Sequence, residues 1–347
     1  GVADGSFSML HVTATATGGT NNFGVYNISS SPSMNNVTAT ATGSTNNFGV
    51  YNDSSSPSMN NVTATATGGT DNNWGVYNSS SSPTMTNVTA TATGGTFSYG
   101  VYNNSSSPTM NNVTATATDG TNNYGVNNSS SSSPSMNNVT ATATGGTDSR
   151  GVYNSSSSPT MTDVTATATG GTNSRGVNNS SSSPTMTDVT ATATGGTNSN
   201  FSYGVFNNSS SPMMNNVTAT ATDSSSQNYG VLNLSSSPTM TNVTATATDG
   251  VSSYGVKNDS SSPMMNNVTA TATGGTFSYG VSNRSFSSPS IRNSSITGTT
   301  NSIENSLSSA KVADSMLDGF VDGTSFTCVG VHNDFVALDE DCLTLTP

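Results

Sequence analysis

The string Val-Thr-Ala-Thr-Ala-Thr recurs along the 347-residue chain and constrains its fold more than any other feature. It has eleven copies, spaced mostly 25 or 26 residues apart, which begin at Val12, Val37, Val62, Val88, Val113, Val139, Val164, Val189, Val217, Val243 and Val268. Prolines and a Gly-Val pair recur in step with it. Repetition at a fixed period of roughly 20–50 residues is typical of solenoids, whose units pack on their own copies.

The repeat unit favours strands and excludes helix. Val and Thr are β-branched, Gly, Pro and Ser interrupt every unit, and apolar and polar residues alternate with period two. Each unit has one long alternating run and two shorter ones, which predicts three strands per coil, stacked parallel about 4.8 Å from the next coil. Parallel connections are almost always right-handed. We therefore predict an all-β, right-handed parallel β-helix (β-solenoid) of about 12 coils of roughly 25 residues.

The second coil illustrates the predicted assignment. Its strands are expected at 23–27, 32–34 and 37–42, with a tight corner at Asn35 and Asn36. The inward positions are expected to be Val25, Met34, Val37, Ala39 and Ala41. This core is thin, so stability must come from stacking of coils on one another.

Two domains are predicted, a repeat domain at 1–298 and a C-terminal cap of divergent coils at 299–347. The chain opens at a first-strand position without a matching cap, which suggests either truncation or an end that docks onto another molecule. A short strand near the C-terminus could add to that end in the next copy. Its residues are Leu343, Thr344, Leu345 and Thr346.

Charge and cysteine content narrow the classes of binding partner and the cellular location. Six basic residues against 18 acidic ones give a net charge of -12, which argues against nucleic acid. No stretch approaches the roughly 20 apolar residues that a membrane span requires. Cys328 and Cys342 are the only cysteines, and they form either one disulfide or two free thiols. A disulfide would indicate an oxidising, extracellular location.

Two asparagine columns recur once per coil. One occupies the tight corner, at Asn36, Asn61, Asn87, Asn112, Asn138, Asn216, Asn242 and Asn267, and the other includes Asn27 and Asn52. Corner asparagines can satisfy backbone groups and bond the same residue one coil away, which predicts a structural ladder. The alternative is N-glycosylation of the Asn-Val-Thr motifs. The ladder is preferred on the expectation that the corner side chain faces inward.

The unit from Asn87 to Met110 resembles tandem repeats in secreted bacterial proteins of the right-handed parallel β-helix, pectate-lyase-like superfamily. The segments IRNSSITGTTNSIEN and SFTCVGVHNDFVALDEDC are similar to the C-terminal end of the same proteins. The resemblance covers nearly the whole chain and implies the fold. It implies little about function, because most such proteins are uncharacterised surface or extracellular proteins.

An enzymatic site is not evident in the sequence. Arg150 and Arg175 replace aromatic residues in adjacent coils, and Asp163 and Asp188 replace the corner asparagine there. Lyases of this fold need clustered carboxylates and a basic residue, but duplication of one coil, with each arginine balancing its own aspartate, accounts for the four residues. No triad, metal-ligand spacing or phosphate loop occurs. We therefore predict a protein that is not an enzyme and has no cofactor or metal.

The outward threonines of the long run form a regular grid. Its first three rows are Thr38, Thr40, Thr42, Thr63, Thr65, Thr67, Thr89, Thr91 and Thr93. Neighbours lie about 6.6–6.8 Å apart along a strand and about 4.8 Å apart between coils. Such a grid resembles the ice-binding face of β-solenoid antifreeze proteins, although Thr is also a good polar residue for any exposed strand.

The main functional prediction is a non-enzymatic extracellular rod that assembles end to end with itself as a fibre or filament subunit, or acts as a surface adhesin. The first alternative is an ice-binding protein that uses the Thr grid. The second is a carbohydrate-binding or polysaccharide-lyase-like protein, for which an outward aromatic column through Tyr26, Tyr51 and Tyr77 is a candidate stripe.

Overall fold

The computed structural model describes residues 7–196, 199–333 and 336–342, and these form strands and turns without any helix. The chain divides into two compact units, Gly1–Gly171 and Thr172–Pro347. In each unit the strands wind into the parallel coils of a β-solenoid, about 12 along the whole chain. The predicted fold class is confirmed. The predicted boundary between 1–298 and 299–347 falls within a strand of the second unit and stays a prediction.

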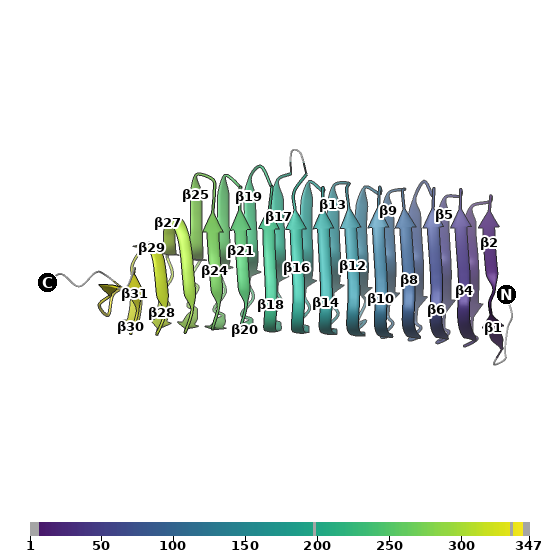
Figure 1. Ribbon diagram of the computed structural model, residues 1–347, viewed down its shortest axis with the longest axis horizontal. Coiled ribbons are helices and arrows are strands. Elements are labelled where there is room, and N and C mark those ends of the chain that lie inside the picture. Colours follow the sequence, from purple (N-terminus) through teal and green to yellow (C-terminus); the bar gives the residue numbers. More distant parts are fainter. Residues whose placement is uncertain (1–6, 197–198, 334–335, 343–347) are drawn as a thin grey trace. The chain divides into compact units, whose positions relative to one another are not determined.

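Unit 1 alternates eight-residue and ten-residue strands after two short ones. Its strands are β1 (Ser8–Leu10), β2 (Thr13–Thr17), β3 (Asn21–Ile28), β4 (Ser33–Thr42), β5 (Asn46–Asp53), β6 (Ser58–Thr67), β7 (Asn72–Ser79), β8 (Thr84–Thr93), β9 (Phe97–Asn104), β10 (Thr109–Thr118), β11 (Asn122–Ser129), β12 (Ser135–Thr144), β13 (Asp148–Ser155) and β14 (Thr160–Thr169). The ten-residue strands lie side by side in Figure 1, with each pointing the same way.

Unit 2 begins with the same alternation and then shortens its strands. They are β15 (Asn173–Ser180), β16 (Thr185–Thr194), β17 (Phe201–Asn208), β18 (Met213–Thr222), β19 (Gln227–Leu234), β20 (Thr239–Thr241), β21 (Thr244–Thr248), β22 (Ser252–Asp259), β23 (Met264–Asn266), β24 (Thr269–Thr273), β25 (Phe277–Arg284), β26 (Ser290–Arg292), β27 (Ser295–Ser306), β28 (Ala310–Ala313), β29 (Met316–Asp322), β30 (Phe326–Val329), β31 (His332–Asn333) and β32 (Val336–Ala337).

Each strand pairs with its copy one coil away, parallel and in register. In unit 1, for example, Met34 pairs with Met59 and Val37 with Val62. Identical side chains therefore stack in columns. In the described residues of the C-terminal region the one antiparallel pairing joins β31 and β32, which ends the parallel series.

The predicted core is confirmed in the second coil, where Val25, Met34, Val37, Ala39 and Ala41 are all buried. Full burial of a Met or Val side chain contributes about 1.5–3 kcal/mol. The alanines are small because the first strand of the coil lies directly on the third. A Cβ at Gly49 would lie 2.6 Å from the backbone nitrogen of Thr65, which explains the recurring glycine.

The corner of the coil is a single residue in the left-handed region. Asn36 has φ of 53°, and each later corner residue has a similar value. In unit 1 the second and third predicted strands run together as one ten-residue strand that bends at this residue. Asn tolerates this conformation better than most residues, which explains its choice at the corner.

Candidate functional site

The predicted corner ladder is present, but it lies on the surface. The Asn61 side-chain amide donates to Oδ1 of Asn36 at 3.3 Å, and the amide of Asn87 donates to Asn61 at 3.1 Å. Both positions are exposed. The expectation that the corner side chain faces inward is therefore wrong, because the positive φ turns Cβ away from the core. The preference for a ladder over N-glycosylation rested on that expectation, so it is no longer supported by side-chain direction.

The buried ladder belongs to the second asparagine column. Asn27 donates to Asn52 at 2.8 Å, Asn52 donates to Asn78 at 2.8 Å, and Asn78 donates to Asn103 at 2.8 Å. Each of these side chains is at most 1% exposed. In such a column one residue's amide satisfies the next residue's carbonyl oxygen, which is what a buried polar group requires.

The outward threonines form the predicted columns in unit 1. Thr38 pairs in register with Thr63, and Thr63 with Thr89. The first column is exposed, whereas the second and third columns are half-buried. The strands that carry this grid, which we call the Thr face, contain no ionisable residue between Thr38 and Thr42 or at the matching positions of the next coils of unit 1.

Two adjacent columns of rings lie on the outer side of the first strands of unit 1. The ring centroids of Phe23 and Phe48 are 4.7 Å apart at 11°, and those of Tyr51 and Tyr77 are 4.9 Å apart at 4°. The rings are stacked, so their faces cover one another and only their edges reach solvent. Sugar rings pack on exposed aromatic faces. The predicted aromatic stripe is therefore mainly a stabilising ladder.

The arginine and aspartate constellation is divided between different parts of the coil. Arg150 lies in the aromatic column, donates to the Tyr124 hydroxyl at 2.8 Å and forms its ion pair with Asp148 at 3.7 Å. Asp163 lies instead at an exposed corner. Asp188 also occupies a corner, where it accepts a bond from Asn216 at 3.0 Å. The expected balance of Arg150 by Asp163 is wrong.

Burial controls the ionisation of the ring columns. It raises the pKa of Tyr51 to about 12, with a smaller contribution from Asp53. Lys257 stacks on Tyr229 and Tyr254, at 5.4 Å and 4.8 Å from the ring centroids. Burial lowers its pKa, and the nearby Arg284 acts in the same direction. These shifts follow from packing in a ladder.

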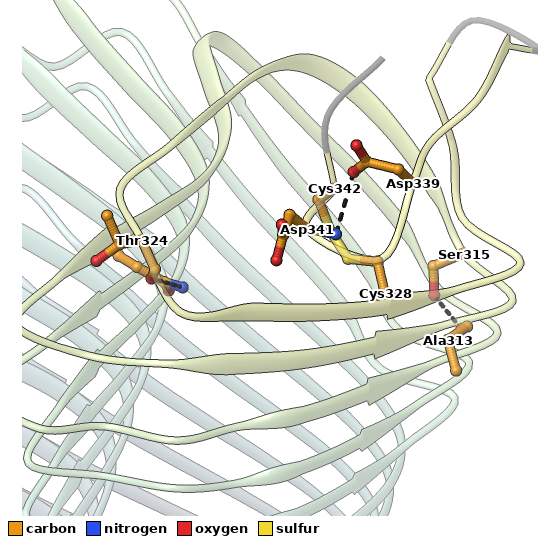
Figure 2. The surroundings of a disulfide bond; sticks show 8 residues. Ala313, Ser315, Thr324, Cys328, Asp339, Asp341 and Cys342 are labelled. Carbon is orange, nitrogen blue, oxygen red and sulfur yellow. Dashed lines mark hydrogen bonds between the residues drawn. A yellow bond between two sulfur atoms is a disulfide. The ribbon is translucent and has the colours of Figure 1, made fainter. Parts of the chain in front are cut away.

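A disulfide joins Cys328 on β30 to Cys342 (Figure 2). The backbone amide of Cys328 donates to the carbonyl of Glu340 at 2.8 Å, so the final segment also bonds the last coil through its backbone. The predicted assembly strand, Leu343, Thr344, Leu345 and Thr346, lies outside the described residues. End-to-end assembly therefore stays a prediction.

A groove in unit 2 was not predicted from the sequence. It has a volume of about 590 Å³ and crosses the outer side of β20, β23 and β26. The residues that line it are Thr239, Met240, Thr241, Met264, Met265, Asn266, Ser290, Arg292 and Asn293, of which Met240 and Met265 have buried side chains. A smaller hollow of about 170 Å³ shares Ser290 and Arg292 with it and continues to Lys311 on β28. We call the two together the C-terminal groove.

The C-terminal groove combines apolar, polar and cationic groups. Met264 is 63% exposed. Arg292 and Lys311 are exposed too, and no ion pair to either occurs within the residues that the structure describes. The register runs from Thr239 through Met264 and Ser290 to Lys311, so these four side chains form one column. The sequence signal was the departure from the repeat, where Met264 and Lys311 replace Ser or Thr and Arg292 replaces Asn or Thr.

No cluster of metal-binding side chains occurs among the described residues. Nor does any described helix have the length and apolar character of a membrane span.

No protein-family model and no curated protein matches the chain. Solved structures do match it. The Vag8–C1 inhibitor complex matches at a TM-score of 0.53 and 12% identity, over 96% of this chain and 94% of that chain. By fold, the chain is a right-handed parallel β-helix protein. Its expected place among secreted bacterial tandem-repeat proteins of the pectate-lyase-like superfamily stays a prediction.

Enzymes are also among the matched structures. A mannuronan C-5 epimerase A-module from Azotobacter vinelandii matches at a TM-score of 0.42 and 10% identity, over 98% of this chain and 91% of that one. The catalytic domain of a GH87 α-1,3-glucanase matches at a TM-score of 0.39 and 10% identity, over 94% of this chain and 62% of that chain. The prediction that the chain is not an enzyme is corrected by these matches, since the coil architecture also occurs in catalytic domains. They assign no reaction to this chain.

Proposed function

We propose that the chain binds an extended acidic polysaccharide along the C-terminal groove. The observation that carries this proposal is the pair of exposed cations in the C-terminal groove of a chain with only six basic residues. Arg292 lines both hollows of the groove, and Lys311 lines the smaller one. The groove follows the column direction, so it offers similar positions about every 4.8 Å. A polymer with a short repeat of its own suits such a surface better than a compact ligand does.

The neutral lining suits sugar hydroxyl groups. Thr239, Thr241, Asn266 and Ser290 offer hydroxyl and amide groups that both donate and accept hydrogen bonds. Met264 supplies a flexible apolar surface for the carbon-bound hydrogens of a sugar ring. Ligand sites of this kind combine an apolar surface with a few polar groups that fix orientation.

The two exposed cations of the groove, Arg292 and Lys311, favour a negatively charged polymer over a neutral one. The whole chain has a net charge of -12, so a polyanion is repelled at long range and must be held by local contacts. An arginine can hold a carboxylate through two parallel hydrogen bonds, whereas a lysine acts as a point charge. We therefore expect polyuronates to bind better than neutral glucans, and binding to weaken as salt screens the two cations.

Native affinity electrophoresis tests this proposal. The protein is run through gels that contain polygalacturonate, alginate or dextran. We expect retardation by the acidic polymers, and we expect Arg292→Ala to lose most of it. Equal mobility in all three gels would contradict the proposal.

Two methionines provide a matched control. Met213 and Met264 are both exposed, and both pair in register with Thr239. Only Met264 lines the groove. Met264→Thr should therefore weaken retardation several-fold, whereas Met213→Thr should leave it unchanged. An equal effect of the two substitutions would place binding elsewhere.

An extracellular location is part of the same proposal, because acidic polysaccharides are matrix and cell-wall polymers. The disulfide between Cys328 and Cys342 supports it, since disulfides persist in oxidising compartments.

A further inference from the structure

The Thr face of unit 1 is a second surface with its own chemistry. Its exposed first column consists of Thr13, Thr38, Thr63, Thr89, Thr114, Thr140 and Thr165, which pair in register from coil to coil. The second and third columns repeat the arrangement two and four residues further along each strand. The result is a two-dimensional array of identical side chains, each with a hydroxyl and a methyl group.

The hydroxyl groups of this array are largely free to bind water. In the described part of unit 1, two hydrogen bonds between neighbouring coils involve them. They join Thr118 to Thr93 and Thr169 to Thr144, both at 3.3 Å and both within the third column. The first two columns from Thr38 to Thr167 have none with protein atoms in that part. Because Thr is β-branched, its side chain has few rotamers, so the hydroxyl positions are well ordered.

We propose that the Thr face binds the surface of ice. Its hydroxyls repeat about every 4.8 Å between coils and about every 6.6 Å along a strand. Ice also presents water oxygens in flat, repeating rows with spacings of similar size, so waters held on the face can join the crystal. A protein partner fits less well, because such interfaces are anchored by aromatic residues, Met or Arg. The face has none of these in unit 1.

Matched substitutions on one strand test this site. Thr114 and Thr109 are both exposed and both lie on β10, but Thr109 precedes the corner and points off the Thr face. We expect the full chain to shape ice crystals and to produce thermal hysteresis in the cold. Thr114→Lys should reduce the hysteresis several-fold, and Thr109→Lys should leave it unchanged.

Two further variants make the outcome decisive. Thr114→Val keeps the branched shape and removes one hydroxyl, so it should reduce hysteresis while circular dichroism shows an intact fold. Arg292→Ala lies in unit 2 and should not change hysteresis, which separates this site from the C-terminal groove. Unshaped ice with the unsubstituted chain would overturn the proposal, and so would equal loss from the Thr114→Lys and Thr109→Lys variants.

Discussion

The repeated coils of unit 1 and the last coils of unit 2 use different residues to let the first and third strands of a coil approach closely. In unit 1 the first strand carries a glycine, such as Gly100, which lies against the alanine-rich third strand. In β27 the matching first-strand position is Ser302, and Gly298 takes the place that Ala272 has one coil earlier. The two strands approach so closely that one of them must carry glycine, but either can.

The same contrast applies to the surface. In unit 1 the repeat places identical or similar side chains next to one another in adjacent coils. Asparagines therefore hydrogen-bond to asparagines, and aromatic rings stack on aromatic rings. Such columns satisfy themselves and leave little for a ligand except the regular Thr face. Where the repeat decays, Met264, Arg292 and Lys311 become exposed without a matching neighbour. Departure from the repeat is therefore the better guide to a binding groove.

The largest expected effect on the free energy of unfolding comes from placing a carboxylate in the buried asparagine ladder. Asn103→Asp places a carboxylate at a site that is 0% exposed and removes the amide that donates to Asn128. We expect a loss of about 3–5 kcal/mol in unfolding free energy, measured by chemical denaturation. Asn112→Asp, at the exposed corner, should change it by less than about 0.5 kcal/mol, since Asp163 and Asp188 occupy this position naturally.

The end of the ladder sharpens that test. Asn305 is 6% exposed, and its amide donates to the backbone oxygen of Thr324 at 3.4 Å rather than to another asparagine. Asn305→Asp should cost less than Asn103→Asp. If the two cost the same, the interior of unit 1 and the end of the series do not differ in the way we describe.

The next effect comes from the close approach of strands. A Cβ at Gly100 would lie 2.6 Å from the carbonyl oxygen of Gly125, and one at Gly298 would lie 2.5 Å from the nitrogen of Gly280. Gly100→Ala and Gly298→Ala should each cost about 3 kcal/mol, because backbone must move. Gly145→Ala, which meets no atom within 4 Å, should cost about 1–2 kcal/mol from its positive φ alone. Thermal denaturation ranks the three, and equal losses would contradict the packing argument.

The smallest effect concerns alkaline pH. Burial raises the pKa of Tyr51 from 10.0 to about 12, so the folded chain holds this proton more tightly than the unfolded chain does. The resulting stability is fully present below pH 10 and is lost as pH rises toward 12. Phenolate absorbance and circular dichroism should show tyrosine ionisation together with loss of the coils in that range. Ionisation of every tyrosine near pH 10, without loss of structure, would refute it.

Period and alternation were sufficient to predict the fold and the core, because each inward residue, such as Met34, recurs at the same place in every unit. They predicted the corner at Asn35 and Asn36 but not the direction of its side chain. The positive φ of Asn36 turns this side chain outward, and the repeat pattern does not reveal φ. They also failed for the C-terminal groove. The departure from the repeat at Met264 marks the place, but a hollow depends on how side chains from three coils lie together.

The most direct measurement of the central claim is a crystal structure of the full chain soaked with a short polyuronate. We expect the oligosaccharide to lie across β20, β23 and β26, with a carboxylate on Arg292 and a sugar ring against Met264. An oligosaccharide bound along the aromatic columns of unit 1, with the C-terminal groove empty, would contradict the account.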